Sequence, residues 1–410
     1  MLIEAEAELA TLLWTFVADV RLWSAELPDT REALFARPSV RMRRQVADAV
    51  REYPVLRWAL GTLEAMVSAP AATRASDVSV ACSKILAWAE AHQMVETAVQ
   101  FAEAAALAAP RDAQLAAIAG TACARVADGA RAEIWFRRAT RLGRRNRDYE
   151  WYIRGYIRFA NLVYEAGDYV RAHRYYEKAL KVATWRGRPG FAGQGAHGML
   201  TIAIHTAPYA KAEQLALAAL ELYPANNERL PHLAHDIAFL LVRHSWYAQA
   251  LRILDVVLPM LTRPHERIVV MGSVARAAAG VRDRERFEQA AGEVELLAEI
   301  SDEGAAMALV HVAEGLATWE DWTAAEQLAG RAVEIAGRRG ERDTQRQAHA
   351  TLNRIRTRSV PLPAPDTTVE RIEATVSVVL ARLQNQFEPA QRPGAPAIAN
   401  SELPVLTTPV

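Results

Sequence analysis

Two arginines, an asparagine and a tyrosine lie along one predicted helix. Arg154, Arg158, Asn161 and Tyr164 are spaced so that they lie on one face of an α-helix. A guanidinium offers a planar pair of donors that matches a carboxylate, and an asparagine amide can bridge a peptide backbone. The pattern predicts a site that binds a peptide carboxylate. The alternative is that the two arginines form ordinary salt bridges with acidic residues nearby.

A histidine-rich stretch follows, with seven of the ten histidines between residues 197 and 311. His232, His235 and Asp236 lie on adjacent turns of one predicted helix, and neutral imidazoles beside a carboxylate can bind zinc. The stretch lacks the H-E-x-x-H pattern of zinc peptidases. We therefore expect no metal and no cofactor. We expect instead that His197, Thr201, His232 and His235 face a polar binding surface.

Sequence patterns of common enzymes are missing. The chain contains neither the phosphate-binding G-x-x-x-x-G-K-[ST] motif nor the nucleophile motif G-x-S-x-G. The run GRPGFAGQG at residues 187–195 has four glycines but no predicted strand before it. We interpret this run as a loop between two helices, and we expect that the protein is not an enzyme.

These residues lie within a repeated pattern of small and bulky apolar residues. In each copy an apolar residue follows the first residue by four positions, and a second small or apolar residue follows three positions later. The seven copies are Ala98/Ala102/Ala105, Ala132/Phe136/Ala139, Ala172/Tyr176/Ala179, Ala212/Ala216/Ala219, Ala250/Leu254/Val257, Ala290/Val294/Leu297 and Ala325/Ala329/Ala332. Successive copies are 34 to 40 residues apart. Such a period predicts stacked helical repeats, in which small residues allow close helix packing.

The pattern resembles the tetratricopeptide repeat over about residues 78–337. The best match, at residues 153–184, has Gly167-Asp168-Tyr169 as the turn between its helices. A second turn is expected at Glu320-Asp321-Trp322. The resemblance implies an all-α, right-handed solenoid of about seven helix–turn–helix repeats, in which the first helix of each repeat lines a concave groove. We therefore predict a scaffold or adaptor that binds a partner peptide or helix in this groove.

A regulatory sensor of a peptide or small molecule is the alternative function. In that case residues 1–77 would be an effector, whereas the scaffold hypothesis makes them a helical cap on the solenoid. Residues 2–24 are predicted to form one amphipathic helix, and prolines punctuate the rest of this segment.

The solenoid is predicted to span residues 78–358, followed by a Pro-rich linker and one amphipathic helix at about 368–387. This helix could cap the solenoid, or lie in the groove of its own or a neighbouring molecule and so form a homo-oligomer. The tail after residue 388 is expected to be disordered.

Charge and cysteine content restrict the partners. Lys plus Arg and Asp plus Glu are 48 each, so the net charge is zero and nucleic acid is not expected as a partner. No apolar stretch is long enough to predict a membrane helix. Cys82 and Cys123 lie in Ala-rich helical patterns and are expected to be buried thiols. Free thiols fit a reducing compartment and the acidic N-terminus is unlike a signal peptide, so we expect a cytoplasmic protein. Arg greatly exceeds Lys, as in GC-rich genomes, and we expect a bacterial source.

Overall fold

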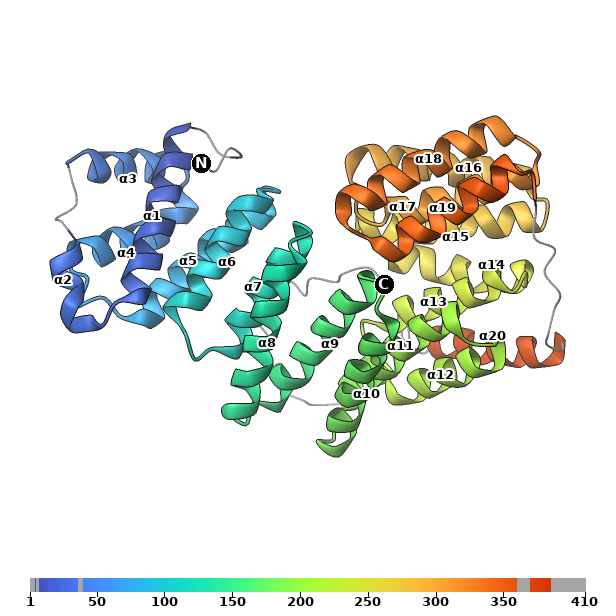
Figure 1. The fold of residues 1–410 in the computed structure, drawn as a ribbon, viewed down its shortest axis with the longest axis horizontal. Helices are drawn as coiled ribbons and strands as arrows, with labels where there is room; N and C mark the ends of the chain where they lie inside the picture. The colour runs from blue at the N-terminus through green and yellow to red at the C-terminus, as the bar shows by residue number, and fades with distance from the viewer. Residues whose placement is uncertain (1–3, 5–6, 36–39, 360–368, 385–410) are drawn as a thin grey trace. The chain divides into compact units, whose positions relative to one another are not determined.

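The computed structural model describes residues 4, 7–35, 40–359 and 369–384, and these residues form helices and turns without a strand. The chain divides into two compact units, residues 1–162 and 163–410, with the boundary inside helix α9 (Figure 1). The first unit contains α1 (Ala7–Ala25), α2 (Arg31–Leu34), α3 (Val40–Glu52), α4 (Arg57–Ser68), α5 (Ala75–Ala91), α6 (Val95–Ala108), α7 (Ala113–Arg125), α8 (Gly129–Arg145) and most of α9 (Tyr149–Glu165).

The second unit contains the remaining helices. They are α10 (Tyr169–Trp185), α11 (Pro189–Thr206), α12 (Tyr209–Leu222), α13 (Leu230–Arg243), α14 (Tyr247–Val257), α15 (Pro264–Gly280), α16 (Arg284–Ile300), α17 (Ala305–Thr318), α18 (Trp322–Arg339), α19 (Arg342–Arg356) and α20 (Val369–Gln384). Short 3-10 turns η1 (Pro28–Thr30), η2 (Pro54–Leu56) and η3 (Leu258–Met260) complete the described structure.

Seven consecutive helix pairs, α5/α6 to α17/α18, correspond to the seven predicted repeats. Each predicted triad lies on the second helix of a pair, and every member except the half-buried Leu297 is buried. Small side chains at these positions let neighbouring helices approach, and the larger member fills the remaining space. The predicted all-α solenoid of about seven repeats is therefore confirmed.

The turn within most pairs is a left-handed residue followed by a helix cap. Gly167 has φ of +81°, and the N–H of Asp168 donates to the carbonyl of Val163 at 3.0 Å. The Asp168 carboxylate then accepts from the N–H of Arg171 at 3.0 Å, which satisfies a free donor at the start of α10. Glu320 and Asp321 repeat this geometry before α18. Both predicted turns are confirmed.

The glycine-rich run at 187–195 corrects one expectation. We predicted a loop, but residues from Pro189 onward belong to helix α11. A Cβ at Gly193 would lie 2.7 Å from the ring of Tyr223, and a Cβ at Gly198 would overlap the ring of Tyr176. These glycines are therefore present because α11 packs closely against its neighbours, and proline is tolerated in the first turn of the helix.

The N-terminal helices pack on the first repeat within unit 1. Helix α1 covers α6, and Arg21 of α1 donates to Gln100 of α6 at 2.7 Å. The carboxylate of Glu4 accepts from the backbone N–H groups of Glu96 and Thr97 at 2.9 Å each, so it caps the start of α6. The helix predicted at 2–24 is described from Ala7 to Ala25. The predicted boundary at 77 falls inside α5 and remains a prediction.

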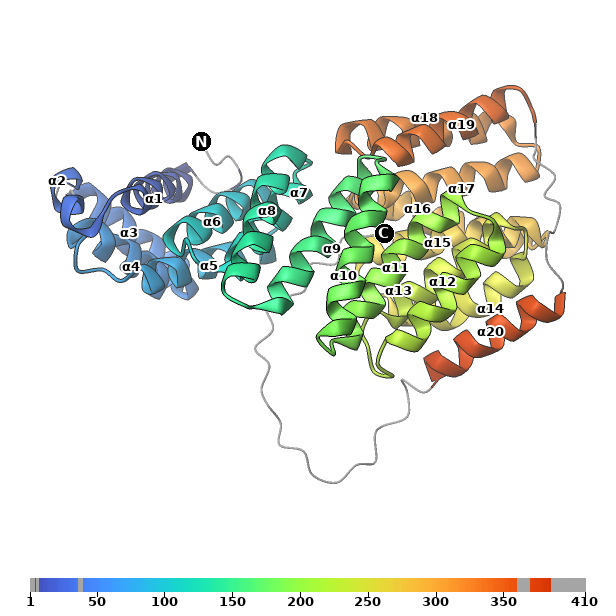
Figure 2. The same ribbon diagram turned by 60° about the horizontal axis from the view of Figure 1, so that its bottom comes forward.

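Helix α20 forms where an amphipathic helix was predicted at about 368–387. It packs against α12, α13 and α14, with Ile372, Val376, Val379 and Leu383 buried (Figure 2). The helix does not cap the last repeat. Two of the three helices that it contacts, α12 and α14, are second helices of their pairs, so it does not lie along the first helices only. It returns along the chain to the fourth and fifth pairs. The tail predicted to be disordered after residue 388 lies outside the described residues.

Within the described ranges, no helix is both long and apolar enough to cross a membrane.

Candidate functional site

The first helices of the pairs in unit 2, together with Tyr164 and Tyr169, carry a set of polar and aromatic side chains that we call the first-helix face. Its members come from the end of α9, the start of α10, and from α11, α13, α15, α17 and α19. They are Tyr164, Tyr169, His197, His205, His235, Asp236, Phe239, Arg243, Ser273, His311, Asp343 and Arg346.

A buried chain of hydrogen bonds joins α11, α13 and α15 at this face. Asp236 accepts from His197 Nε2 at 2.8 Å and from His235 Nδ1 at 3.1 Å. The second nitrogen of each ring faces a hydroxyl group. His235 Nε2 lies 3.1 Å from Ser273 Oγ, and His197 Nδ1 lies 3.3 Å from the Tyr223 hydroxyl. Burial raises the pKa of Asp236, but the two imidazole hydrogen bonds outweigh this effect and hold it well below its usual range.

Ser273, His235 and Asp236 are hydrogen-bonded in the order found in serine hydrolases, but they are buried in the packed interior. The Ser273 side chain is completely buried, with 0% of its surface exposed. A substrate has no access to a hydroxyl in this position. The chain of hydrogen bonds therefore joins three helices, and each buried polar group in it has a partner.

The predicted histidine site separates into two parts. His197, His235 and Thr201 are buried, and the Thr201 hydroxyl donates to the carbonyl of Gly198 at 2.9 Å. His232 is half-buried and its Nε2 lies 3.1 Å from Glu266 of α15, away from Asp236. Among the residues that the structure describes, no three histidine, cysteine or acidic side chains are arranged to hold a metal ion.

The predicted arginine site lies on α9. The Arg154 side chain is 33% exposed, pairs with Glu150 at 3.1 Å and stacks on the ring of Trp151 at 5.2 Å. This is the salt bridge that the alternative interpretation predicted. Arg158 and Asn161 are half-buried, and both interact with other groups. Tyr164, also half-buried, is the one predicted α9 residue that lies in unit 2.

Sequence reasoning missed a continuous series of rings at the first-helix face. The ring of Tyr169 is stacked on that of His205, with centroids 6.3 Å apart and an interplanar angle of 15°. His205 lies 5.9 Å from Phe239, and Phe239 lies 5.3 Å from His311. The series crosses α10, α11, α13 and α17, and Tyr164 joins it 5.4 Å from Tyr169. No sequence signal connects Tyr169, His205, Phe239 and His311, because they belong to four different repeats.

Two histidines in this series are held neutral by burial. Burial lowers the pKa of His311 to about 4, and Glu314 opposes this shift only in part. Burial and the nearby Arg243 lower the pKa of His205 to about 4 as well. The Nδ1 atom of His311 is buried without a hydrogen-bond partner. The series therefore contains neutral imidazoles beside aromatic rings. Tyr169, His205 and Phe239 are half-buried, and His311 is buried behind them.

Guanidinium groups form the edges of the first-helix face. Arg346 pairs with Asp343, and Arg276 and Arg354 both pair with Glu314. Burial raises the pKa of Glu314, but these two arginines outweigh it and lower the pKa. The result is an apolar and imidazole centre beside alternating charges. Such an arrangement suits a peptide, which carries both apolar side chains and charged or polar groups.

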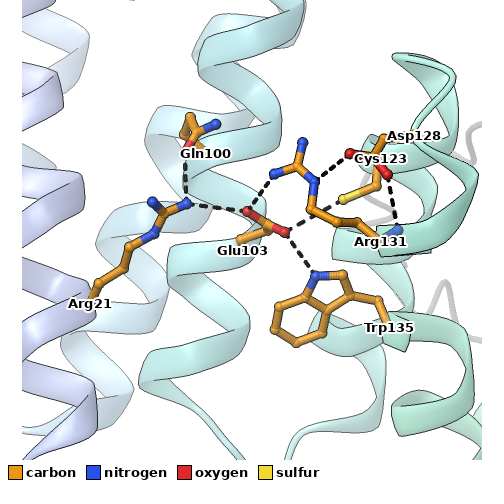
Figure 3. A network of polar contacts seen from close by, with 7 residues as sticks. All are labelled: Arg21, Gln100, Glu103, Cys123, Asp128, Arg131 and Trp135. Atoms are coloured by element: carbon orange, nitrogen blue, oxygen red, sulfur yellow. Dashed lines mark hydrogen bonds and ion pairs between the residues drawn. The ribbon is translucent and has the colours of Figure 1, made fainter. Parts of the chain in front are cut away.

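A separate polar cluster lies in unit 1 and is shown in Figure 3. Glu103 of α6 is buried and accepts from Arg21 and Arg131 at 3.2 Å each, and from the indole N–H of Trp135 at 3.0 Å. The Cys123 thiol lies 3.6 Å from the same carboxylate. Cys82 and Cys123 are buried free thiols as predicted, and burial is the main cause that raises the pKa of each to about 12. This cluster joins α1, α6, α7 and α8.

Comparison with known proteins supports the fold. No family model matches the sequence, and no curated protein matches it significantly. A Rap protein complexed with Competence and Sporulation Factor is 12% identical with a TM-score of 0.51, covering 82% of this chain and 99% of that chain. The Rap conjugation gene regulator of plasmid pLS20, in complex with the Phr* peptide, is 11% identical with a TM-score of 0.46, covering 85% and 99%. PilF of Pseudomonas aeruginosa is 17% identical with a TM-score of 0.39, covering 56% and 96%.

The helix pairs, their small-residue second helices and the left-handed turns define an all-α solenoid of helix–turn–helix repeats, and the Rap protein with a TM-score of 0.51 shares this fold. The family resemblance inferred from the sequence is thus confirmed at the level of the fold.

Proposed function

We propose that the protein is a peptide-binding adaptor and that the first-helix face of unit 2 holds the ligand. The series of rings from Tyr169 through His205 and Phe239 to His311 carries this proposal. In a repeat array, side chains from successive repeats form one extended surface, which suits an extended ligand better than a small one. The similar Rap protein is itself complexed with Competence and Sporulation Factor.

Some of the binding residues predicted from the sequence have exposed surface, and we include these among the proposed contacts. Within unit 2, Tyr164 on α9 and His232 on α13 are half-buried, so each retains surface for a ligand. Arg154, Arg158 and Asn161 are also half-buried, and we propose them as a separate contact surface of unit 1. The buried His197 and His235 join α11 to α13 through Asp236, and the buried Thr201 bonds to the α11 backbone, so these three residues stabilise the face and are not proposed as ligand contacts.

The alternative of a sensor with an effector at residues 1–77 has less support. The indole N–H of Trp23 donates to the carbonyl of Pro70 at 2.8 Å, and Arg21 pairs with the buried Glu103 at 3.2 Å. Both contacts fix the N-terminal helices to one another and to the first repeat. They favour a cap that covers the end of the array.

The test is selection of peptides from a display library on the full-length chain, followed by affinity measurements. We expect Phe239→Ala to weaken the selected peptides by at least about tenfold, because it removes a ring at the centre of the series. Trp185→Ala is the matched control, since this aromatic residue of α10 is 71% exposed on a second helix. Loss of binding in the control, together with unchanged affinity in Phe239→Ala, would overturn the proposed location.

Partner capture from a lysate adds a second measurement. A partner held by wild type should be lost from the triple variant Arg154→Ala/Arg158→Ala/Asn161→Ala if the α9 residues contribute contacts. Retention of the partner would show that the α9 residues of unit 1 are not a contact surface for it.

A further inference from the structure

Helix α20 binds a different surface from the one proposed above, and a buried carboxylate marks where it docks. Glu213 of α12 is only 2% exposed. It accepts hydrogen bonds from Tyr209 of its own helix at 3.2 Å and from Thr375 of α20 at 2.7 Å. It also forms an ion pair with Arg371 of α20. The guanidinium that neutralises this buried charge is therefore supplied by the docked helix.

The other contacts fix the direction of α20. Arg382 of α20 donates to the carbonyl of Tyr223, the residue that follows the end of α12. Arg371 and Arg382 thus bind along α12 in the same order in which their partners Glu213 and Tyr223 occur, so the two helices run parallel. A cation at the carbonyl end of a helix is also favourable for the helix dipole.

A third contact reaches α14. Glu373 of α20 accepts from Gln249 at 3.2 Å and pairs with Arg252. Between the two polar edges, Ile372, Val376, Val379 and Leu383 are buried in the core of unit 2. The surface is therefore complementary to one helix pattern, which has an arginine, a threonine four residues later and an apolar stripe beside them.

We propose that this surface of α12, α13 and α14 is a specific helix-binding site, and that α20 is its resident ligand in cis. We call it the α20 site. Glu213 provides the specificity, because a helix with only an apolar stripe would leave its carboxylate buried without a cation. Amphipathic helices that lack the Arg-x-x-x-Thr pattern are therefore rejected. This inference does not depend on the peptide site at the first-helix face.

The connection between α19 and α20 suits a ligand held by a tether. Twelve residues separate Arg356 from Val369, and they include the sequence VPLPAP. A tether of this length supplies its ligand at a high effective concentration, on the order of millimolar. The same helix offered as a separate peptide must therefore compete with the tethered copy, unless the tethered copy is first displaced.

The experiment uses the full-length chain with Val376→Asp, which places a charge in the buried stripe and displaces the resident helix. A fluorescent peptide of residues 369–384 with the natural sequence should then bind saturably, as measured by anisotropy. Peptides with Arg371→Ala or Thr375→Val should each bind at least about tenfold more weakly, since each loses a hydrogen bond to a buried carboxylate. Val378→Ala is the matched control peptide, because Val378 is 50% exposed on α20.

A variant of the site completes the test. Adding Glu213→Gln to the displaced chain should weaken the natural peptide, and the Arg371→Ala peptide should then show little further loss. Equal affinity of all peptides would overturn the proposed specificity, and no binding by a chain with wild-type circular dichroism would overturn the site itself. A dimer that the free peptide dissociates would support the site, with α20 exchanged between two copies.

Discussion

Arg346 of α19 donates a hydrogen bond to the hydroxyl of Tyr169 at the start of α10, at 3.4 Å, although 177 residues separate them in the sequence. The guanidinium also lies 5.8 Å from the centre of the Tyr169 ring. Repeats in a solenoid generally contact only their neighbours. Within unit 2 this contact therefore joins α10 to α19, the helix that follows the last of the seven pairs. Both residues belong to the first-helix face proposed to bind the peptide.

Replacing Arg346 by alanine tests the importance of that contact. The side chain is 63% exposed, so we expect the free energy of unfolding to fall by less than about 1 kcal/mol. Amide exchange in α19 should nevertheless accelerate relative to α16, because a non-local contact of α19 is lost. Arg338→Ala, which removes an exposed pair with Asp302, is the control. Equal exchange in the two variants would show that the Tyr169 contact is dispensable.

The carboxylate of Glu103 should be the most sensitive polar group in unit 1. Glu103→Ala leaves Arg21, Arg131 and the Trp135 indole without their common acceptor, so we expect a loss of about 3 kcal/mol. Urea unfolding measures this loss in the free energy of unfolding. Glu133→Ala is the matched control on the surface of α8, where an exposed pair with Arg137 is worth at most about 1 kcal/mol. Similar losses in both variants would contradict the role given to burial.

Close helix packing predicts opposite effects for two helical glycines. Gly198→Ala places a methyl group into the Tyr176 ring and should cost at least about 2 kcal/mol. Gly292→Ala in α16 meets no atom within 4 Å and should stabilise the protein by about 0.5–1 kcal/mol, because alanine favours helix. Thermal unfolding compares the two. A stabilising Gly198→Ala would mean that α10 and α11 lie further apart than described.

Acidification should destabilise unit 2 through its buried imidazoles. The pKa of His311 is 6.5 before folding and about 4 after it, so between these values the unfolded chain binds a proton that the folded chain does not. Stability is therefore complete above pH 6.5 and falls as the pH decreases toward 4. The contribution is on the order of 3 kcal/mol.

The variant His311→Gln should reduce this pH dependence, measured as the free energy of unfolding at pH 7 and pH 5. His349→Gln, at an exposed position on α19, is the control. If the two variants keep the same dependence on pH, the acid sensitivity comes from other groups, such as Asp236 with its lowered pKa.

The sequence predicted the repeats because their determinants are local. Ala172, Tyr176 and Ala179 recur at fixed spacing on one helix, and Gly167-Asp168 sets the turn before it, so periodicity and turn chemistry are enough. The glycines of α11 were misinterpreted because close packing and a loop give the same composition. At Gly193 the ring of Tyr223 distinguishes the two, and it lies outside α11.

The sites depend on contacts that periodicity does not encode. His197 and His235 were predicted to face a polar binding surface, but both are buried around Asp236, which follows from the packing of α11 on α13. Glu213 looks like an ordinary surface residue in the sequence, because its partners Arg371 and Thr375 occur more than 150 residues later. The apolar stripe of α20 predicted that the helix would pack, and it could not show against which surface.

The return of α20 to α12–α14 also restricts how the array can evolve. Repeat proteins commonly gain or lose whole repeats without losing their architecture. Here the path from α19 to α20 has twelve residues, a length that can span roughly 40 Å at most. Inserting a helix pair between α14 and α19 would lengthen that path, and deleting α12 would remove Glu213. The length of this connection therefore limits how many helix pairs this chain can hold between α14 and α20.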